Sequence, residues 1–252
     1  MIPVVTGGVL VYARLAGLLM TLPGVSVRAV PSYARLFVAV PLTLLMLPGV
    51  GTTEVPSALS VLFSQLASEA LFGVAMGLCV TLVFGALATA AEVISTQSGL
   101  HIAAMLDPLT MTQPGAAGVL VTWLGTGVFL GENLHLRCIR ALGDSLHQVP
   151  PGHASAAFMA ANQLIPLAGV AITTGIQLAG PITAFVFCVN LGLSLLGRMA
   201  PGLQIFFAIG PTITVAASFG LMAISLPAIL ETWYDTLPRA FVAIADLLGP
   251  PR

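Results

Sequence analysis

The chain has 252 residues, of which 58% are hydrophobic and 7% are charged, whereas a soluble domain usually carries about 25% charged residues. With a mean hydropathy of +1.04, this composition excludes a soluble enzyme and predicts an integral membrane protein. The net charge is −1 and all 8 basic residues are arginine, so no basic patch for nucleic acid is expected.

Six hydrophobic segments follow one another, and a membrane-spanning helix needs about 20 mostly apolar residues. They cover residues 4–22, 36–50, 66–94, 116–130 (with an extension toward Leu142), 164–196 and 203–230. Pro181, Pro211 and Pro227 lie inside the last two segments and should kink them, because proline lacks the amide donor. Pro-Gly pairs between segments, such as Pro23-Gly24 and Pro151-Gly152, mark turns. We therefore predict an all-α membrane protein that forms a single membrane-embedded domain over residues 1–252.

Arg14 lies inside the first hydrophobic segment. A central arginine costs about 3 kcal/mol on the insertion scale, and each surrounding Leu, Ile, Val or Phe returns about 0.3–0.6 kcal/mol. Two interpretations stay open. The side chain extends along the helix to the membrane surface, or it is buried against a carboxylate in an assembly.

Small or polar residues recur at every fourth position of the third segment. A helix turns about 100° per residue, so this stripe winds slowly around the helix and favours close, tilted helix crossings. The pattern fits packing within this chain and packing between subunits equally well. The stripe consists of Glu69, Gly73, Gly77, Thr81, Gly85 and Thr89.

The stretch between the third and fourth segments breaks the helical pattern but is too apolar for an ordinary solvated loop. Non-helical backbone is tolerated at membrane depth only inside protein or along a water-filled cavity. We therefore predict a buried or pore-occluding loop, in which flexible methionines fill irregular gaps; an ordinary connection between helices is the alternative. Its characteristic residues are Met105, Leu106, Asp107, Pro108, Met111, Gln113, Pro114 and Gly115.

No catalytic, cofactor-binding or metal-binding motif is evident. The cysteines, Cys79, Cys138 and Cys188, lie far apart in apolar stretches and are interpreted as packing residues. The sequence has no nucleophile elbow, HExxH motif or phosphate-binding loop. We therefore predict a protein that is not an enzyme and needs no cofactor.

The order and spacing of several motifs resemble the FliR family, called SpaR, YscT or HrcT in injectisomes, of the type III secretion export apparatus. The motifs are RLAGLLMTLPG at 14–24, the acid-then-glycine helix at 69–77, Gln97-Ser-Gly99 before Asp107-Pro108, the 132–150 region, and Gly197-Arg198-Met-Ala-Pro201 followed by Phe206 and Pro211. Gly202, Leu134 and Leu146 depart from the family pattern.

The resemblance implies a subunit of the export gate in the bacterial inner membrane, in a flagellar basal body or an injectisome base. FliP- and FliQ-like subunits and an FlhB-like protein would be its partners, and unfolded export substrates would pass through the shared pore. The family's plug loop falls on residues 106–118. Arg14, Glu69, Gly73, Gly77, Thr81, Gly85, Arg198, Pro201, Phe206 and Pro211 would pack helices or subunits together.

A multi-pass small-molecule secondary transporter is the alternative function. Transporters often consist of two related halves with broken helices at corresponding positions. The sequence shows no clear internal repeat and few ionisable residues for coupling to an ion gradient. A transporter should also be stable without partners, whereas a gate subunit should depend on them.

Overall fold

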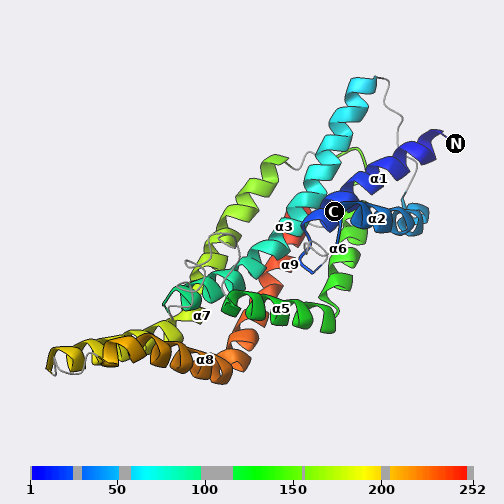
Figure 1. Ribbon diagram of the computed structural model, residues 1–252. Coiled ribbons are helices and arrows are strands. Elements are labelled where there is room, and N and C mark those ends of the chain that lie inside the picture. The colour runs from blue at the N-terminus through cyan, green and yellow to red at the C-terminus, as the bar shows by residue number, and fades with distance from the viewer. Residues whose placement is uncertain are drawn as a thin grey trace. The chain divides into compact units, whose positions relative to one another are not determined.

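A computed structural model describes residues 2–24, 30–50, 58–97, 116–154, 157–199 and 205–248, and helices account for nearly all of these residues (Figure 1). This confirms the predicted all-α membrane fold. The helices are α1 (Ile2–Thr21), α2 (Ser32–Met46), the short 3₁₀ helix η1 (Leu47–Gly49), α3 (Leu59–Gln97), α5 (Ala116–Gly131), α6 (Leu134–Gln148), α7 (Ala157–Met199), α8 (Ile205–Tyr234) and α9 (Leu237–Leu248).

Each of the six predicted segments coincides with one helix, but within the described ranges two further helices, α6 and α9, were not predicted. The fourth segment does not continue to Leu142, because α5 ends at Gly131 and α6 begins at Leu134. Asn133 between them has a φ of 54°, in the left-handed region that asparagine tolerates better than most residues. A left-handed residue interrupts the helical hydrogen bonding, so the chain turns there.

Among the residues that the structure describes, five stretches are long and apolar enough to cross a membrane: Val4–Thr21, Ser32–Gly49, Leu59–Gln97, Asn162–Arg198 and Thr212–Leu247. At a rise of 1.5 Å per residue, α3 and α7 are each about 60 Å long, roughly twice the hydrocarbon core of a bilayer. In α7 the helix continues through Pro181, so this proline does not end it. The two longest helices therefore exceed what simple spanning requires.

Two of the predicted Pro-Gly turns contain a glycine with positive φ. Gly24 has a φ of 82° and Gly152 a φ of 93°, a conformation that costs residues with a Cβ atom several tenths of a kcal/mol or more. The Pro48-Gly49 pair forms part of η1 instead. The predicted turn at Pro114-Gly115 lies outside the described residues.

The chain divides into two compact units. Unit 1 consists of Met1–Phe84, Thr126–Gly169 and Leu237–Arg252, and unit 2 of Gly85–Gly125 and Val170–Thr236. Both units are therefore assembled from separate parts of the sequence. The prediction of one domain over residues 1–252 stays a prediction.

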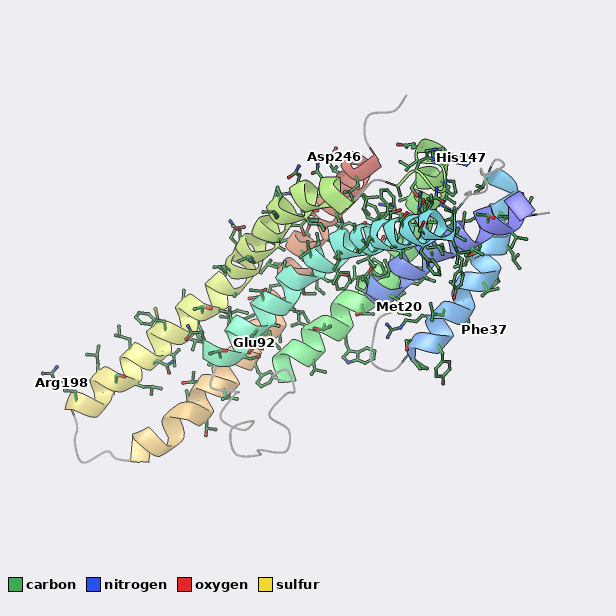
Figure 2. All side chains as sticks on the ribbon, turned by 90° about the horizontal axis from the view of Figure 1, so that it is seen from above. Met20, Phe37, Glu92, His147, Arg198 and Asp246 are labelled. Atoms are coloured by element: carbon green, nitrogen blue, oxygen red, sulfur yellow. The ribbon has the colours of Figure 1, made fainter. Side chains whose placement is uncertain are left out.

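In unit 1, α1 packs along α2, and α6 packs against α9 (Figure 1). Ala39 and Thr43 of α2 lie one helical turn apart and are buried. Most of the other side chains of this helix are exposed. Phe37, for example, is 80% exposed (Figure 2). Helices α6 and α9 are amphipathic, with Leu142 and Ile244 among their buried residues and charged residues on their exposed faces.

In unit 2, α7 lies close to the second part of α3 and pairs with α8. A Cβ atom at Gly175 would meet the carbonyl oxygen of Ala86 and the side chain of Thr89, so α7 and α3 approach closely there. Thr214 of α8 donates a hydrogen bond to the Asn190 Oδ1 atom of α7 at 3.1 Å. Large apolar side chains on α7 and α8 remain exposed, among them Ile176, Phe187, Leu195, Phe219 and Ile224.

Candidate functional site

The most strongly polar feature inside unit 1 is an ion pair between Arg14 of α1 and Glu69 of α3. The Nε atom of Arg14 donates to Oε2 of Glu69 at 2.6 Å, and both side chains are fully buried. The partner acid of Arg14 therefore lies in the same chain. The side chain does not extend to the surface, so the first interpretation of Arg14 was wrong, and the second was right about burial but not about an assembly.

The remaining donors of Arg14 bind the C-terminal end of α6. Nη1 donates to the carbonyl oxygen and the hydroxyl of Ser145 at 3.2 and 3.1 Å, and Nη2 donates to the carbonyl oxygen of Val149 at 3.1 Å. Backbone carbonyls at a helix C-terminus carry partial negative charge and often lack intrahelical donors. The guanidinium therefore caps α6 while it neutralises Glu69.

The second carboxylate oxygen of Glu69 fixes the turn that follows α6. The backbone N–H of Gly152 donates to Oε1 of Glu69 at 2.8 Å. The guanidinium carbon of Arg14 also lies 4.8 Å from the ring centroid of Phe72, a distance at which cation–π attraction operates. We call Arg14, Glu69, Phe72, Ser145, Val149 and Gly152 the Arg14 cluster. It joins α1, α3 and the α6–α7 connection through charge-assisted hydrogen bonds.

On both sides of this ion pair, the backbones of α1 and α3 approach each other closely. A Cβ atom added at Gly73 would overlap the carbonyl oxygen of Arg14, and one at Gly17 would overlap that of Ala70. At Gly77 an added Cβ would collide with the Thr21 hydroxyl. Small residues on both helices therefore permit the separation at which Arg14 and Glu69 meet.

The stripe of small and polar residues on α3 continues beyond this crossing with different surroundings. Thr81 donates hydrogen bonds to the carbonyl oxygens of Thr21, at 2.5 Å, and Gly77, at 2.9 Å. At Gly85, by contrast, an added Cβ atom would meet nothing within 4 Å. Among the described residues, the contacts between this stripe and α1 run from Glu69 to Thr81.

The other predicted site residues are not brought into the Arg14 cluster. Arg198 is exposed at the end of α7 (Figure 2). Phe206 and Pro211 belong to the backbone of α8, but their side chains and all of Pro201 lie outside the described residues. The predicted plug residues Met105, Leu106, Asp107, Pro108, Met111, Gln113, Pro114 and Gly115 also lie outside them. The last three residues of the 106–118 loop, from Ala116 onward, already form the start of α5.

Among the described residues, no cluster of side chains could hold a metal ion. No group of three or more His, Cys, Asp or Glu side chains comes together within the ranges described above. Burial raises the pKa of the Cys138 thiol on α6 from 9.0 to about 12, so it is protonated at neutral pH. This thiol is therefore inert and acts as a small apolar packing group.

Sequence reasoning singled out Arg14, Glu69 and Gly73 but missed the groups that complete the site. Gly17 faces Ala70 and Val74 of α3, and Ser145 faces Arg14. The available signals were the Arg-Leu-Ala-Gly spacing, which places Gly17 one turn after Arg14, and the turn at Pro151-Gly152. Neither signal predicts which residue of the neighbouring helix Gly17 or Arg14 contacts.

The apolar helices and the internally neutralised charge pair define an integral membrane protein in which buried polar groups hold helices together. The sequence profile of the family described as "Bacterial export proteins, family 1" matches residues 5–240. The chain therefore belongs to this family, the FliR/YscT family of type III export proteins, and is a membrane-embedded component of such an export apparatus.

Three relatives illustrate this membership. The chain is 32% identical over 228 residues to the flagellar biosynthetic protein FliR of Caulobacter vibrioides, with 90% of each chain covered. It is 31% identical to FliR of Escherichia coli K12 over 239 residues, covering 94% of this chain and 90% of the relative. It is 27% identical to the Yop proteins translocation protein T of Yersinia pestis, covering 61% of this chain and 60% of the relative.

Proposed function

We propose that this chain is an inner-membrane subunit of the gate of a flagellar type III export apparatus. There it forms part of the pore for unfolded substrates, together with FliP-, FliQ- and FlhB-like subunits. The observation that carries this proposal is the similarity to flagellar FliR proteins over 90% of both chains, against 61% of this chain for the Yersinia protein. The role is structural and requires no catalysis.

Exposed apolar surface supports a function inside an assembly. Only 22% of the residues in the apolar stretch Asn162–Arg198 are buried within the chain. In Ser32–Gly49 the buried share is 11%. Contiguous apolar surface on this scale marks contact with lipid or with other proteins. The lengths of α3 and α7 favour protein partners for part of it, since both helices exceed the thickness of a bilayer.

Residues 106–118 are the proposed pore plug. The stretch has one charged residue, Asp107, carries Met111 between two threonines, and lies between α3 and the first residues of α5. Flexible methionine side chains suit a seal that must deform to admit a substrate. In this proposal the loop blocks ion flow at rest and moves aside when an unfolded chain enters.

The first test of the proposed function is co-expression of a tagged copy with its FliP- and FliQ-like neighbours, followed by native mass spectrometry of the detergent-solubilised material. We expect a hetero-oligomer that contains one copy of this chain, and a poor yield of the chain expressed alone. A stable monomer or homodimer that ignores both partners would overturn the proposal and favour the transporter.

Deleting residues 107–115 should open the gate to ions. We expect added conductance when the assembled complex is reconstituted in a planar bilayer, because the seal is lost while the flanking helices α3 and α5 remain. A Gly/Ser replacement of the same length is the matched control for chain connectivity, and it should also leak. If both variants conduct no more than the unaltered complex, the plug assignment fails.

A further inference from the structure

The chain passes from one compact unit to the other four times. Three of these crossings run through the interior of a helix, in α3, α5 and α7, and the fourth lies in the turn between α8 and α9. Glycine weakens a helix interior, because it loses more backbone freedom on folding than any other residue. A glycine stands at each of the three helical crossings: Gly85, Gly125 and Gly169.

Close helix packing does not account for two of these glycines. At Gly73 and Gly175 an added Cβ atom would meet the backbone of a neighbouring helix, so close contact requires glycine there. At Gly85 and Gly169, by contrast, an added Cβ atom would meet nothing within 4 Å. Glycine at these two positions makes the helix easier to bend without permitting a closer contact.

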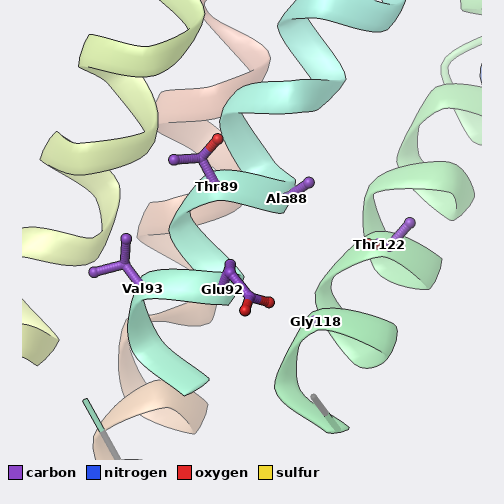
Figure 3. Close-up of a pocket in the computed structure, with 6 residues that line it drawn as sticks. All are labelled: Ala88, Thr89, Glu92, Val93, Gly118 and Thr122. Atoms are coloured by element: carbon purple, nitrogen blue, oxygen red, sulfur yellow. The ribbon is translucent and has the colours of Figure 1, made fainter. Parts of the chain in front are cut away.

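Other groups weaken the helical hydrogen bonding near the same two positions. The hydroxyl of Thr89 donates to the carbonyl oxygen of Gly85 at 2.8 Å, and Figure 3 shows this hydroxyl directed toward the preceding turn of α3. A threonine that bonds back to the residue four positions earlier often bends a helix. In α7, Pro166 lies three residues before Gly169 and supplies no N–H to the carbonyl oxygen of Asn162. Bending is therefore favoured where α3 and α7 pass from one unit to the other.

The crossings in α5 and after α8 are also weak points of the helical structure. In α5, Gly127 follows Gly125 by two positions, and a Cβ atom added at Gly127 would meet nothing within 4 Å. Between α8 and α9, the N–H of Thr236 donates to the carbonyl oxygen of Trp233 at 2.9 Å. This bond spans three residues, as in a turn, whereas an α-helical bond spans four. All four connections should therefore bend more readily than an uninterrupted helix.

We propose that these four connections act together as a hinge, which lets each unit move as a rigid body. Interactions inside the units resist bending, among them the Arg14 cluster in unit 1 and the close contact at Gly175 in unit 2. Hinge motions are absorbed by a few residues, often small ones, while the connected bodies keep their internal packing. The hinge is a property of the isolated chain and does not depend on the proposed function. In an export gate, it permits one unit to stay anchored while the other adjusts to a passing substrate.

The test measures distances between two spin labels by pulsed electron paramagnetic resonance on the detergent-solubilised chain. Cys188 is exposed on α7 and takes one label, whereas Cys79 and Cys138 are buried. The second label is attached at Arg140→Cys in unit 1 or, for comparison within unit 2, at Thr232→Cys, both exposed positions. We expect a broad distance distribution between the units and a narrow one within unit 2. The chain labelled at Cys188 alone supplies the background.

Alanine at the two crossings with free space tests the hinge directly. Gly85→Ala together with Gly169→Ala should remove most of the excess width of the between-unit distribution, because alanine stiffens the helix and the added Cβ atom has room. Gly192→Ala together with Gly220→Ala is the matched control. Both of these glycines lie inside helices of unit 2 with the same free space, so the between-unit width should not change.

A between-unit distribution as narrow as the one within unit 2, in the unaltered chain, overturns the inference. A crossing variant that keeps the full width also overturns it. The same holds for a control variant that narrows the distribution equally, since stiffening would then act anywhere in the helices. Every one of these measurements uses the chain without partners, so a failure of the proposed function leaves the test intact.

Discussion

Replacing Arg14 with alanine should destabilise unit 1 by about 3–5 kcal/mol, the range for breaking a fully buried ion pair. The variant leaves the Glu69 carboxylate buried without its cation and removes the donors that cap α6 at Ser145 and Val149. Thermal unfolding in detergent, followed by circular dichroism, measures the loss. Arg137→Ala, which alters an exposed arginine on α6, is the matched control and should change stability by less than about 0.5 kcal/mol.

A double-mutant cycle separates the ion pair from a general packing effect. Arg14→Met and Glu69→Met should each be strongly destabilising, whereas the double variant should cost less than the sum of the two. An apolar pair of similar volume avoids a buried, uncompensated charge. Recovery should be incomplete, because the N–H of Gly152 then loses its acceptor. Simple additivity of the two changes would contradict the central role assigned to the pair.

Replacing Gly73 with alanine should lower stability by about 1–3 kcal/mol or more, although alanine is the better helix former. The added Cβ atom would overlap the carbonyl oxygen of Arg14, which is backbone and cannot rotate away. Helices α1 and α3 must then separate, which lengthens the contact between Arg14 and Glu69. The same unfolding measurement in detergent reports this loss.

Gly85→Ala is the control in the same helix. Since an added Cβ atom there meets nothing within 4 Å, this change should stabilise the isolated chain by about 0.5–1 kcal/mol through helix propensity. Opposite signs for the two substitutions would establish that contact with α1 decides the effect. Equal effects at Gly73 and Gly85 would contradict the close helix crossing.

The approximate fold was predictable because a bilayer protein must satisfy its backbone hydrogen bonds internally, and long apolar runs achieve this as helices. Helices α6 and α9 are not continuous apolar runs, so hydropathy alone did not predict them. Both helices are amphipathic, and the apolar residues of α6, among them Cys138 and Leu142, recur with the 3.6-residue period of a helix. Helix α7 continues through Pro181, and the kink expected there stays a prediction.

By itself, the sequence determined the membrane class, the family and the residues whose burial would need an explanation. Arg14 and Glu69 stood out because charge is costly in apolar segments, and Gly73 and Gly77 because their spacing favours close helix contact. Only the tertiary structure decided the partners. The ion pair joins residues 55 positions apart, and Arg14 reaches Ser145 131 positions further along the chain. A buried charge in an apolar segment requires a counter-charge, and this can be predicted from hydropathy. Which residue supplies the counter-charge depends on how the helices pack in space.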